Sequence, residues 1–190
     1  LVLTREGRLQ AEAAGKTISS ITIDAIYSSP LQRASETTKI IIDQLQTQLQ
    51  ATFTDDLLEV ELGTWTGLTK EELKNLYPEK IAIWDNEPKE LSITREDGTQ
   101  FQPIKELLSQ AEKFLKSLFI TYSNSNKTIL IVAHNAILRC LILKLINEPS
   151  KGFRRIKLDN TSISIFNINF KNGEERQVQI QCLNNIAHLQ

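Results

Sequence analysis

The sequence predicts an α/β protein, a three-layer α/β/α sandwich around a mostly parallel sheet. Three observations predict it. Segments with a helical apolar period alternate with short apolar segments along the chain. The run TILIVA, residues 128–133, is continuously apolar, as is typical of a strand covered by helices on both faces. Finally, 190 residues suffice for one domain with a full core, and we see neither a linker nor an internal repeat. We therefore expect a single domain over residues 1–190.

The first third of the chain alternates helices with short strands. Thr4 precedes REGRLQAEAAGKTIS and is expected to cap that helix, and Ser29-Pro30 ends the first strand. Gly63 and Gly67 fall in a segment without helical period, DDLLEVELGTWTGL, which we expect to be a loop. The predicted elements in order are a helix from residue 4, a strand at 25–28, a helix at 31–49 and a strand at 51–54.

The rest of the chain begins with a capping-box pattern, in which Thr69 and Glu72 open a helix that stops at Pro78. After the run 128–133 and its helix, SISIFNINF and QVQIQCL alternate with period two around KNGEE, which predicts a hairpin. The remaining predictions are a short helix at 79–84, a polar surface loop at 88–102, a helix at 103–122 and a helix at 136–146.

Composition excludes several classes of partner. A formal charge of -1 gives no basic field for nucleic acid or for an anionic membrane surface, and no apolar stretch is long enough to span a bilayer. Cys140 and Cys182 are far apart among apolar neighbours, so we expect free thiols in a reducing, cytoplasmic compartment. The two histidines and two cysteines show no metal-site spacing, and we expect no metal.

Three polar positions lie where strands are expected to end. Ligands of parallel sheets collect beyond the carboxyl ends of the strands. His134 ends the apolar run, Arg33 falls in the first turn of the helix after strand 25–28, and EVELGTWTG supplies Glu59 and Glu61. Each has an ordinary interpretation, since His134 could simply cap a helix and Arg33 could pair with Glu36 on the surface. Together a histidine, an arginine and a carboxyl group suggest phosphoryl chemistry without a metal.

Four segments in this order also resemble a known family. LTREGRLQAEAAGK, IYSSPLQRASET, LLEVELGTWTGL and ILIVAHNAILRCLI are similar to the signatures of the histidine phosphatase superfamily, which includes cofactor-dependent phosphoglycerate mutases and related small phosphatases. The resemblance covers nearly the whole chain, and four ordered motifs are more specific than any one of them. It implies a phosphoglycerate mutase-like fold.

The resemblance also implies roles for individual residues. Arg33 matches the phosphate-binding arginine of an SPLxRxxET motif, and Glu59 matches the proton donor of an E-x-x-x-G-x-x-x-G pattern. His134 matches the second histidine of the phosphate pocket, which holds the transferred phosphoryl group and is not the nucleophile. Asn135 stands where the family has glycine or asparagine. Glu61 has no counterpart and is expected outside the centre of the site.

Two further segments match less closely. Asn160 and Thr161, in DNTSIS, resemble a segment near the phosphate pocket. The tail LNNIAHL resembles the C-terminal stretch of small phosphatases, among them metal-independent phosphoserine phosphatases, in which the tail forms the substrate side of the pocket. By this match His188 touches a substrate carboxylate; its ordinary interpretation is an exposed residue near a terminus.

The nucleophile of the family belongs to an Arg-His-Gly motif at the end of a first strand, upstream of the LTxxG segment. No such motif precedes Leu3, and the sequence contains no methionine. We therefore expect the first strand and the nucleophile loop to be missing from the N-terminal side of this sequence.

The resemblance implies a metal-independent phosphomonoester hydrolase with a phosphohistidine intermediate and no cofactor. The expected partner is a small acidic phosphorylated metabolite such as phosphoserine or phosphoglycerate, and a homodimer is possible. Three alternatives stay open: a cofactor-dependent phosphoglycerate mutase, a non-catalytic domain that binds phosphorylated ligands, and one half of a longer two-domain chain.

Overall fold

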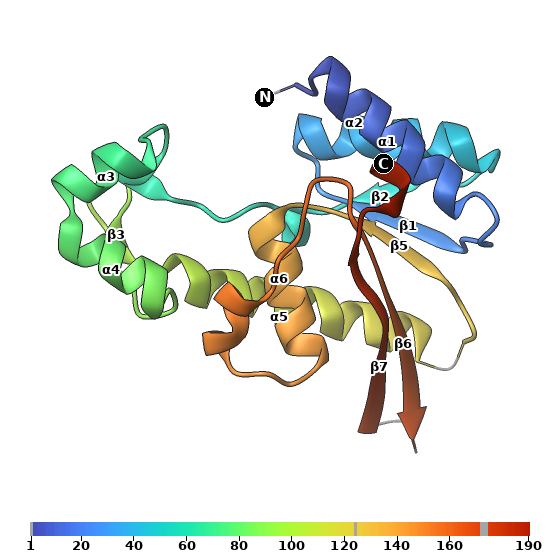
Figure 1. Cartoon of the computed structure of the whole chain (residues 1–190). Coiled ribbons are helices and arrows are strands. Elements are labelled where there is room, and N and C mark those ends of the chain that lie inside the picture. The colour runs from blue at the N-terminus through green and yellow to red at the C-terminus, as the bar shows by residue number, and fades with distance from the viewer. Residues whose placement is uncertain (1, 124, 172–174) are drawn as a thin grey trace.

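The structure is a computed structural model that describes residues 2–123, 125–171 and 175–190. Figure 1 shows the whole chain. The helices and strands are α1 (Arg5–Ile18), β1 (Ala25–Ser28), α2 (Gln32–Leu45), β2 (Ala51–Phe53), α3 (Lys70–Leu76), α4 (Pro78–Asn86), β3 (Ile93–Thr94), β4 (Gln100–Phe101), α5 (Pro103–Tyr122), β5 (Ile129–Val132), α6 (Asn135–Leu145), β6 (Ile163–Lys171) and β7 (Glu175–Asn185).

The central sheet has the strand order β2-β1-β5, and both pairings are parallel. Helices connect these strands, as parallel neighbours require. Helices α1 and α2 lie on one side of the sheet and α5 and α6 on the other (Figure 1). The predicted α/β architecture with a parallel sheet between helices is therefore confirmed. Because Ser28 pairs with Val132, the carboxyl ends of β1 and β5 lie next to each other.

The larger apolar core lies between the sheet and the helices α5 and α6. Tyr27 of β1 packs edge-on against Phe114 of α5, with ring centroids 5.7 Å apart. On α6 the buried apolar positions recur with the helical period that the sequence shows. The members of this core with no exposed surface at all are Leu57, Ile104, Ala111, Ile137 and Cys140.

Strand β5 differs from its prediction. We expected burial on both faces, but each residue of β5 is only half-buried. Within the described residues β5 pairs with β1 alone, while β6 and β7 form a separate antiparallel sheet. The hairpin itself was predicted correctly, although residues 172–174 of its KNGEE turn lie outside the described residues. One edge of an apolar strand is thus without a strand partner in the described part of the chain.

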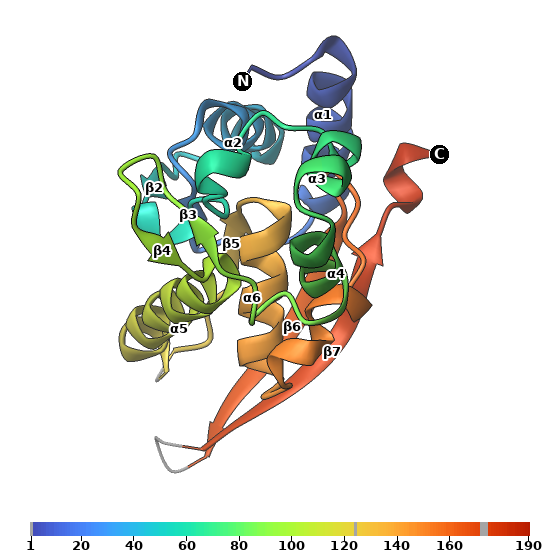
Figure 2. The ribbon, with the colours of Figure 1, turned by 90° about the vertical axis from the view of Figure 1, so that its left-hand side faces the viewer.

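Residues 62–101 form a lobe with a second apolar core, which lies to one side of the sheet in Figure 1 and faces the viewer in Figure 2. The prediction of a surface loop at 88–102 was wrong, because Leu91, Ile93 and Phe101 are buried in this core and β3 pairs with β4. Gly63 closes the lobe with φ of +46°, and a Cβ there would lie 2.3 Å from the carbonyl oxygen of Thr94. Only glycine fits that close approach.

Local signals placed the helix ends well. The Thr4 side chain accepts a hydrogen bond from Gly7 N, and Thr69 and Glu72 form the predicted capping box. Helix α2 ends earlier than predicted because Gln46 adopts a left-handed conformation. Over the described ranges, no helix combines the length and the apolar character that a membrane crossing needs.

Candidate active site

Arg33 and His134 are in direct contact at the carboxyl edge of the sheet. The Nε of Arg33 donates to Nδ1 of His134 at 3.1 Å, although the two residues are 101 positions apart. The Nε2 of His134 lies 2.8 Å from the Oγ of Ser29. Because Nδ1 accepts a hydrogen bond, the imidazole proton resides on Nε2, which donates to Ser29. His134 is therefore a neutral imidazole that binds the arginine on one side and a hydroxyl on the other.

Arg33 and His134 are brought together because the carboxyl ends of β1 and β5 are adjacent. Ser29 N donates to the carbonyl of Val132 at 3.0 Å, so the two segments stay paired for one residue beyond the end of β1. After that step α2 carries Arg33 in its first turn, and His134 becomes the N-cap of α6. Sequence reasoning singled out both positions for this reason. It did not single out Ser29, although the position directly after a strand was the available signal.

Glu59 lies at the N-terminus of the same helix. Its Oε1 accepts from the backbone N–H of Val60 at 2.9 Å and from that of Ala136 at 3.2 Å. Ala136 is two residues after His134, in the first turn of α6, where free N–H groups and the helix dipole attract a negative charge. The structure therefore brings Glu59 to the helix end that presents His134.

Burial and, to a smaller extent, the neighbouring positive charge of Arg33 together lower the pKa of His134 to about 4. The residue is 7% exposed. Protonation would place a second positive charge beside the guanidinium in a site with little water, which is unfavourable. The imidazole is therefore neutral at physiological pH, and its one N–H donor, Nε2–H, is bonded to Ser29, which a phosphoryl oxygen would have to replace.

We expect this histidine to make the fold less stable in acid. Its ordinary pKa is 6.5 and its folded pKa is about 4, so between these values the unfolded chain binds a proton that the folded chain does not. Stability should therefore fall as the pH drops from 6.5 to 4, by at most about 3 kcal/mol from this group, and not further below. Urea unfolding across that range, compared with His134→Gln, measures it. An identical pH dependence in H134Q would contradict the assignment.

The remaining predicted site residues lie around the C-terminal segment. Asn135 Nδ2 donates to the carbonyl of Leu158 at 2.8 Å, which fixes the start of α6 to the chain before β6. Thr161 adopts φ of 54°, and its Oγ1 donates to the carbonyl of Asn160 at 2.8 Å. His188 Nε2 lies 3.1 Å from the carbonyl of Thr161. These residues do not hydrogen-bond to Arg33, His134 or Glu59 in the described residues, so their substrate roles stay predictions.

Two other charged residues, Glu61 and Arg139, lie outside the group formed by Arg33, His134 and Glu59. Glu61 forms an ion pair with Arg95 at 3.1 Å and is exposed, in accord with its expected place outside the centre. Arg139 of α6 was not singled out from the sequence, and its Nε is buried without a hydrogen-bond partner. No sequence signal distinguishes Arg139 from the other basic residues of amphipathic helices.

This arrangement suits an anion with a leaving group that needs a proton. Arg33 supplies a guanidinium, His134 a neutral N–H donor, and Glu59 a carboxyl group at the N-terminus of α6. Guanidinium groups and helix N-termini both bind phosphate oxygens. Within the described ranges, no group of three or more His, Cys, Asp or Glu side chains is placed to hold a metal.

Comparisons with curated proteins point to phosphatases. A probable 2-carboxy-D-arabinitol-1-phosphatase of Arabidopsis thaliana is 30% identical over 164 residues, which are 86% of this chain and 32% of that protein. The chain thus spans about a third of that relative's length. Phosphoserine phosphatase 1 of Hydrogenobacter thermophilus is 27% identical over 189 residues, which are 98% of this chain and 82% of that protein.

Solved structures share the fold. Bacillus stearothermophilus YhfR has a TM-score of 0.83 at 22% identity, over 99% of this chain and 87% of that one. A mycobacterial glucosyl-3-phosphoglycerate phosphatase has a TM-score of 0.80 at 19% identity, over 96% of this chain and 88% of that one. The sequence profile of the Histidine phosphatase superfamily (branch 1) matches residues 1–183. The chain therefore belongs to the histidine phosphatase superfamily.

Proposed function

We propose that this protein is a metal-independent phosphomonoester hydrolase that acts on a small acidic phosphorylated metabolite. One observation carries the proposal: Arg33, His134 and Glu59, which come from three distant segments, converge on the N-terminus of α6. Relatives that are named as phosphatases support hydrolysis over other chemistries. Cys140 and Cys182 are both unpaired, and we place the enzyme in a reducing, cytoplasmic compartment for that reason.

The proposed reaction has two balanced steps. In the first, a histidine nitrogen forms a bond to phosphorus while the bond to the leaving oxygen breaks, and Glu59 gives that oxygen its proton. In the second, water attacks the phosphohistidine, the phosphorus–nitrogen bond breaks, and Glu59 takes a proton from the water. Throughout, the donors of Arg33 and His134 stabilise the phosphoryl oxygens, where negative charge is concentrated.

We propose that the nucleophilic histidine belongs to a strand upstream of Leu3. The resemblance to the family assigns it to an Arg-His-Gly motif. Among the described residues one edge of β5 has no strand partner, and its apolar residues Ile129–Val132 are half-exposed, which supports an additional strand at this place. A parallel strand beside β5 would end at the same edge of the sheet as His134 and would bring its last residues to the site.

Phosphate release and trapping of the intermediate, both measured on the native, full-length protein, test the mechanism. We expect this protein to release inorganic phosphate from phosphoserine in the presence of EDTA. Rapid acid-free quenching should trap a phosphoryl adduct on a histidine upstream of Leu3, identified by tandem mass spectrometry of its N-terminal peptide. Transfer of the phosphoryl group between two hydroxyls of one acid would instead identify a mutase. Binding of phosphoserine without turnover would leave only a phosphate-binding domain.

A further inference from the structure

Arg139 is a half-buried arginine beside the proposed proton donor. It lies on α6 three residues after Ala136, whose backbone N–H binds Glu59 at the N-terminal end of the helix, and the Glu59 charge acts on its guanidinium. Its Nε is buried without a hydrogen-bond partner, and Arg139 forms no ion pair in the described part of the chain. Burial lowers the pKa of Arg139, while the charge of Glu59 opposes that shift. A guanidinium whose Nε–H has lost water without gaining an acceptor is costly and favours an anionic ligand that supplies one.

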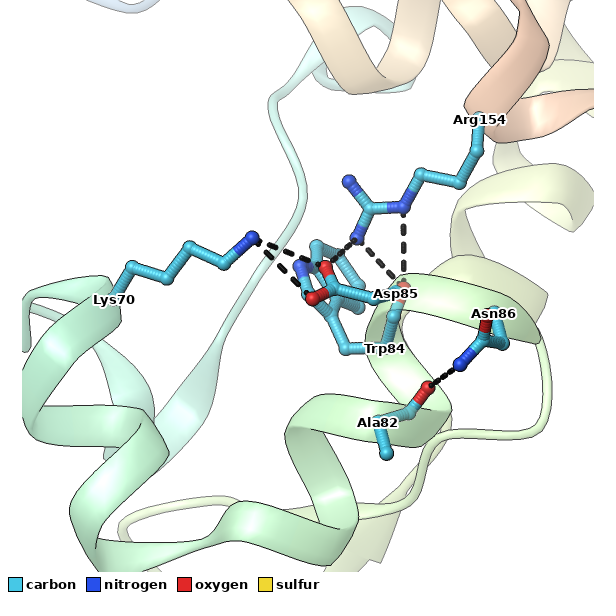
Figure 3. A network of polar contacts seen from close by, with 6 residues as sticks. All are labelled: Lys70, Ala82, Trp84, Asp85, Asn86 and Arg154. Carbon is cyan, nitrogen blue, oxygen red and sulfur yellow. Dashed lines mark hydrogen bonds and ion pairs between the residues drawn. The ribbon is translucent and has the colours of Figure 1, made fainter.

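A second arginine near Arg139 adds positive charge to this region and provides no hydrogen-bond acceptor for Arg139. The guanidinium carbons of Arg139 and Arg154 lie 5.4 Å and 5.8 Å from the ring centre of the buried Phe153. Arg154 already has partners, because its Nε and Nη2 donate to the carbonyl of Trp84 at 3.1 and 2.7 Å (Figure 3). It also lies 3.8 Å from the carboxylate of Asp85. Of these two arginines, Arg139 is the one without a hydrogen-bond or ion-pair partner.

The proposed reaction fixes where the leaving group lies. Its oxygen must reach Glu59 to receive the proton, while the phosphoryl group lies at Arg33 and His134. The atoms beyond that oxygen therefore extend away from Arg33. Along α6 from the end that binds Glu59, the first charged side chain is Arg139. A negatively charged group a few bonds from the leaving oxygen would therefore contact the guanidinium of Arg139.

We propose that Arg139 binds a carboxylate on the leaving group and so selects phosphomonoesters of hydroxy acids. This inference rests on the proposed function. A carboxylate can accept two parallel N–H bonds from a guanidinium, and this geometry makes the pair stronger than contact with a point charge. Phosphomonoesters that lack the carboxylate would leave Arg139 without its partner and bind more weakly.

Equilibrium binding tests the assignment without requiring turnover. Phosphoserine and phosphoethanolamine form a matched pair, because they differ only by the carboxylate. Calorimetry with each compound, and with inorganic phosphate, compares the unaltered protein with Arg139→Met and Arg139→Lys. The control is Arg155→Met, which removes the same charge from an exposed position directly after Arg154 in the chain. Thermal unfolding of each variant shows that the fold is intact, and we expect R139M to be no less stable than the unaltered protein.

We expect R139M to weaken phosphoserine binding about 10- to 100-fold and phosphoethanolamine binding less than about threefold. R139K should recover only part of the loss, and R155M should bind both like the unaltered protein. Equal losses for both compounds, or none for phosphoserine, would overturn the role of Arg139. Failure of the unaltered protein to bind inorganic phosphate would instead refute the proposed site at Arg33 and His134.

Discussion

Replacing Glu59 with glutamine is expected to lower kcat for phosphoserine hydrolysis about 10²- to 10⁴-fold, the usual contribution of a general acid. Glutamine keeps the size of the side chain and an oxygen that can accept from Ala136 N at the start of α6. It cannot give a proton to the leaving alkoxide. The binding of phosphoserine should therefore change little while the chemical step slows, and steady-state kinetics separate the two effects.

The leaving group supplies the internal control for Glu59→Gln. An aryl phosphate such as p-nitrophenyl phosphate leaves as a stable anion and needs little protonation, so E59Q should lose less than about tenfold on it. Glu61→Gln is the matched variant, because Glu61 is exposed and pairs with Arg95 instead of lying at α6. A loss of equal size on both substrates would show that Glu59 acts by holding α6 in place and not as an acid.

Arg33→Lys is expected to lower kcat/KM about 10³-fold, almost as much as Arg33→Ala. Lysine keeps the charge but cannot offer two parallel donors to phosphate oxygens while it also binds Nδ1 of His134. Losses of about this size follow removal of one donor that stabilises the charge of a transition state. Kinetics with phosphoserine give the value, and full activity of R33K would contradict a bidentate role.

A second measurement on the Arg33 variants reports on the site itself. The positive charge of Arg33 contributes to lowering the pKa of His134, so its removal in R33A should raise that pKa toward 6.5. Nuclear magnetic resonance titration of the His134 ring measures the change. Arg155→Met removes a positive charge from an exposed position and should leave the titration unaltered. The absence of any shift in R33A would mean that the contact at 3.1 Å does not persist in solution.

The elements that the sequence predicted well depend on local chemistry. Strand 25–28 and helix 103–122 have the predicted bounds, because Pro30 and Pro103 mark their ends and the apolar period lies within each segment. The failures depend on distant contacts. Burial of Ile93 and Phe101 requires the lobe to close on itself, and half-burial of β5 depends on which strand lies beside it. No local pattern contains that information.

The candidate site likewise has features that the sequence predicts and features that depend on distant contacts. His134, Arg33 and Glu59 were predictable because each lies at the end of a strand or in a loop with a recognisable motif, and strand ends of a parallel sheet meet. The contact between Arg33 and His134 was not predictable in its atoms, since it needs the register of β1 against β5. Arg139 gave no signal because an arginine within an amphipathic helix is ordinary until its burial is known.

The lobe consists of one uninterrupted stretch of chain, residues 62–101, with a core of its own. The chain enters and leaves the lobe once each, and Arg154 contacts Trp84 and Asp85 of the lobe. A stretch of this kind can be lengthened, shortened or exchanged by recombination without changing the residues that bind phosphate. The lobe can therefore differ in length and sequence without disturbing the arrangement of Arg33, Glu59 and His134 at the start of α6.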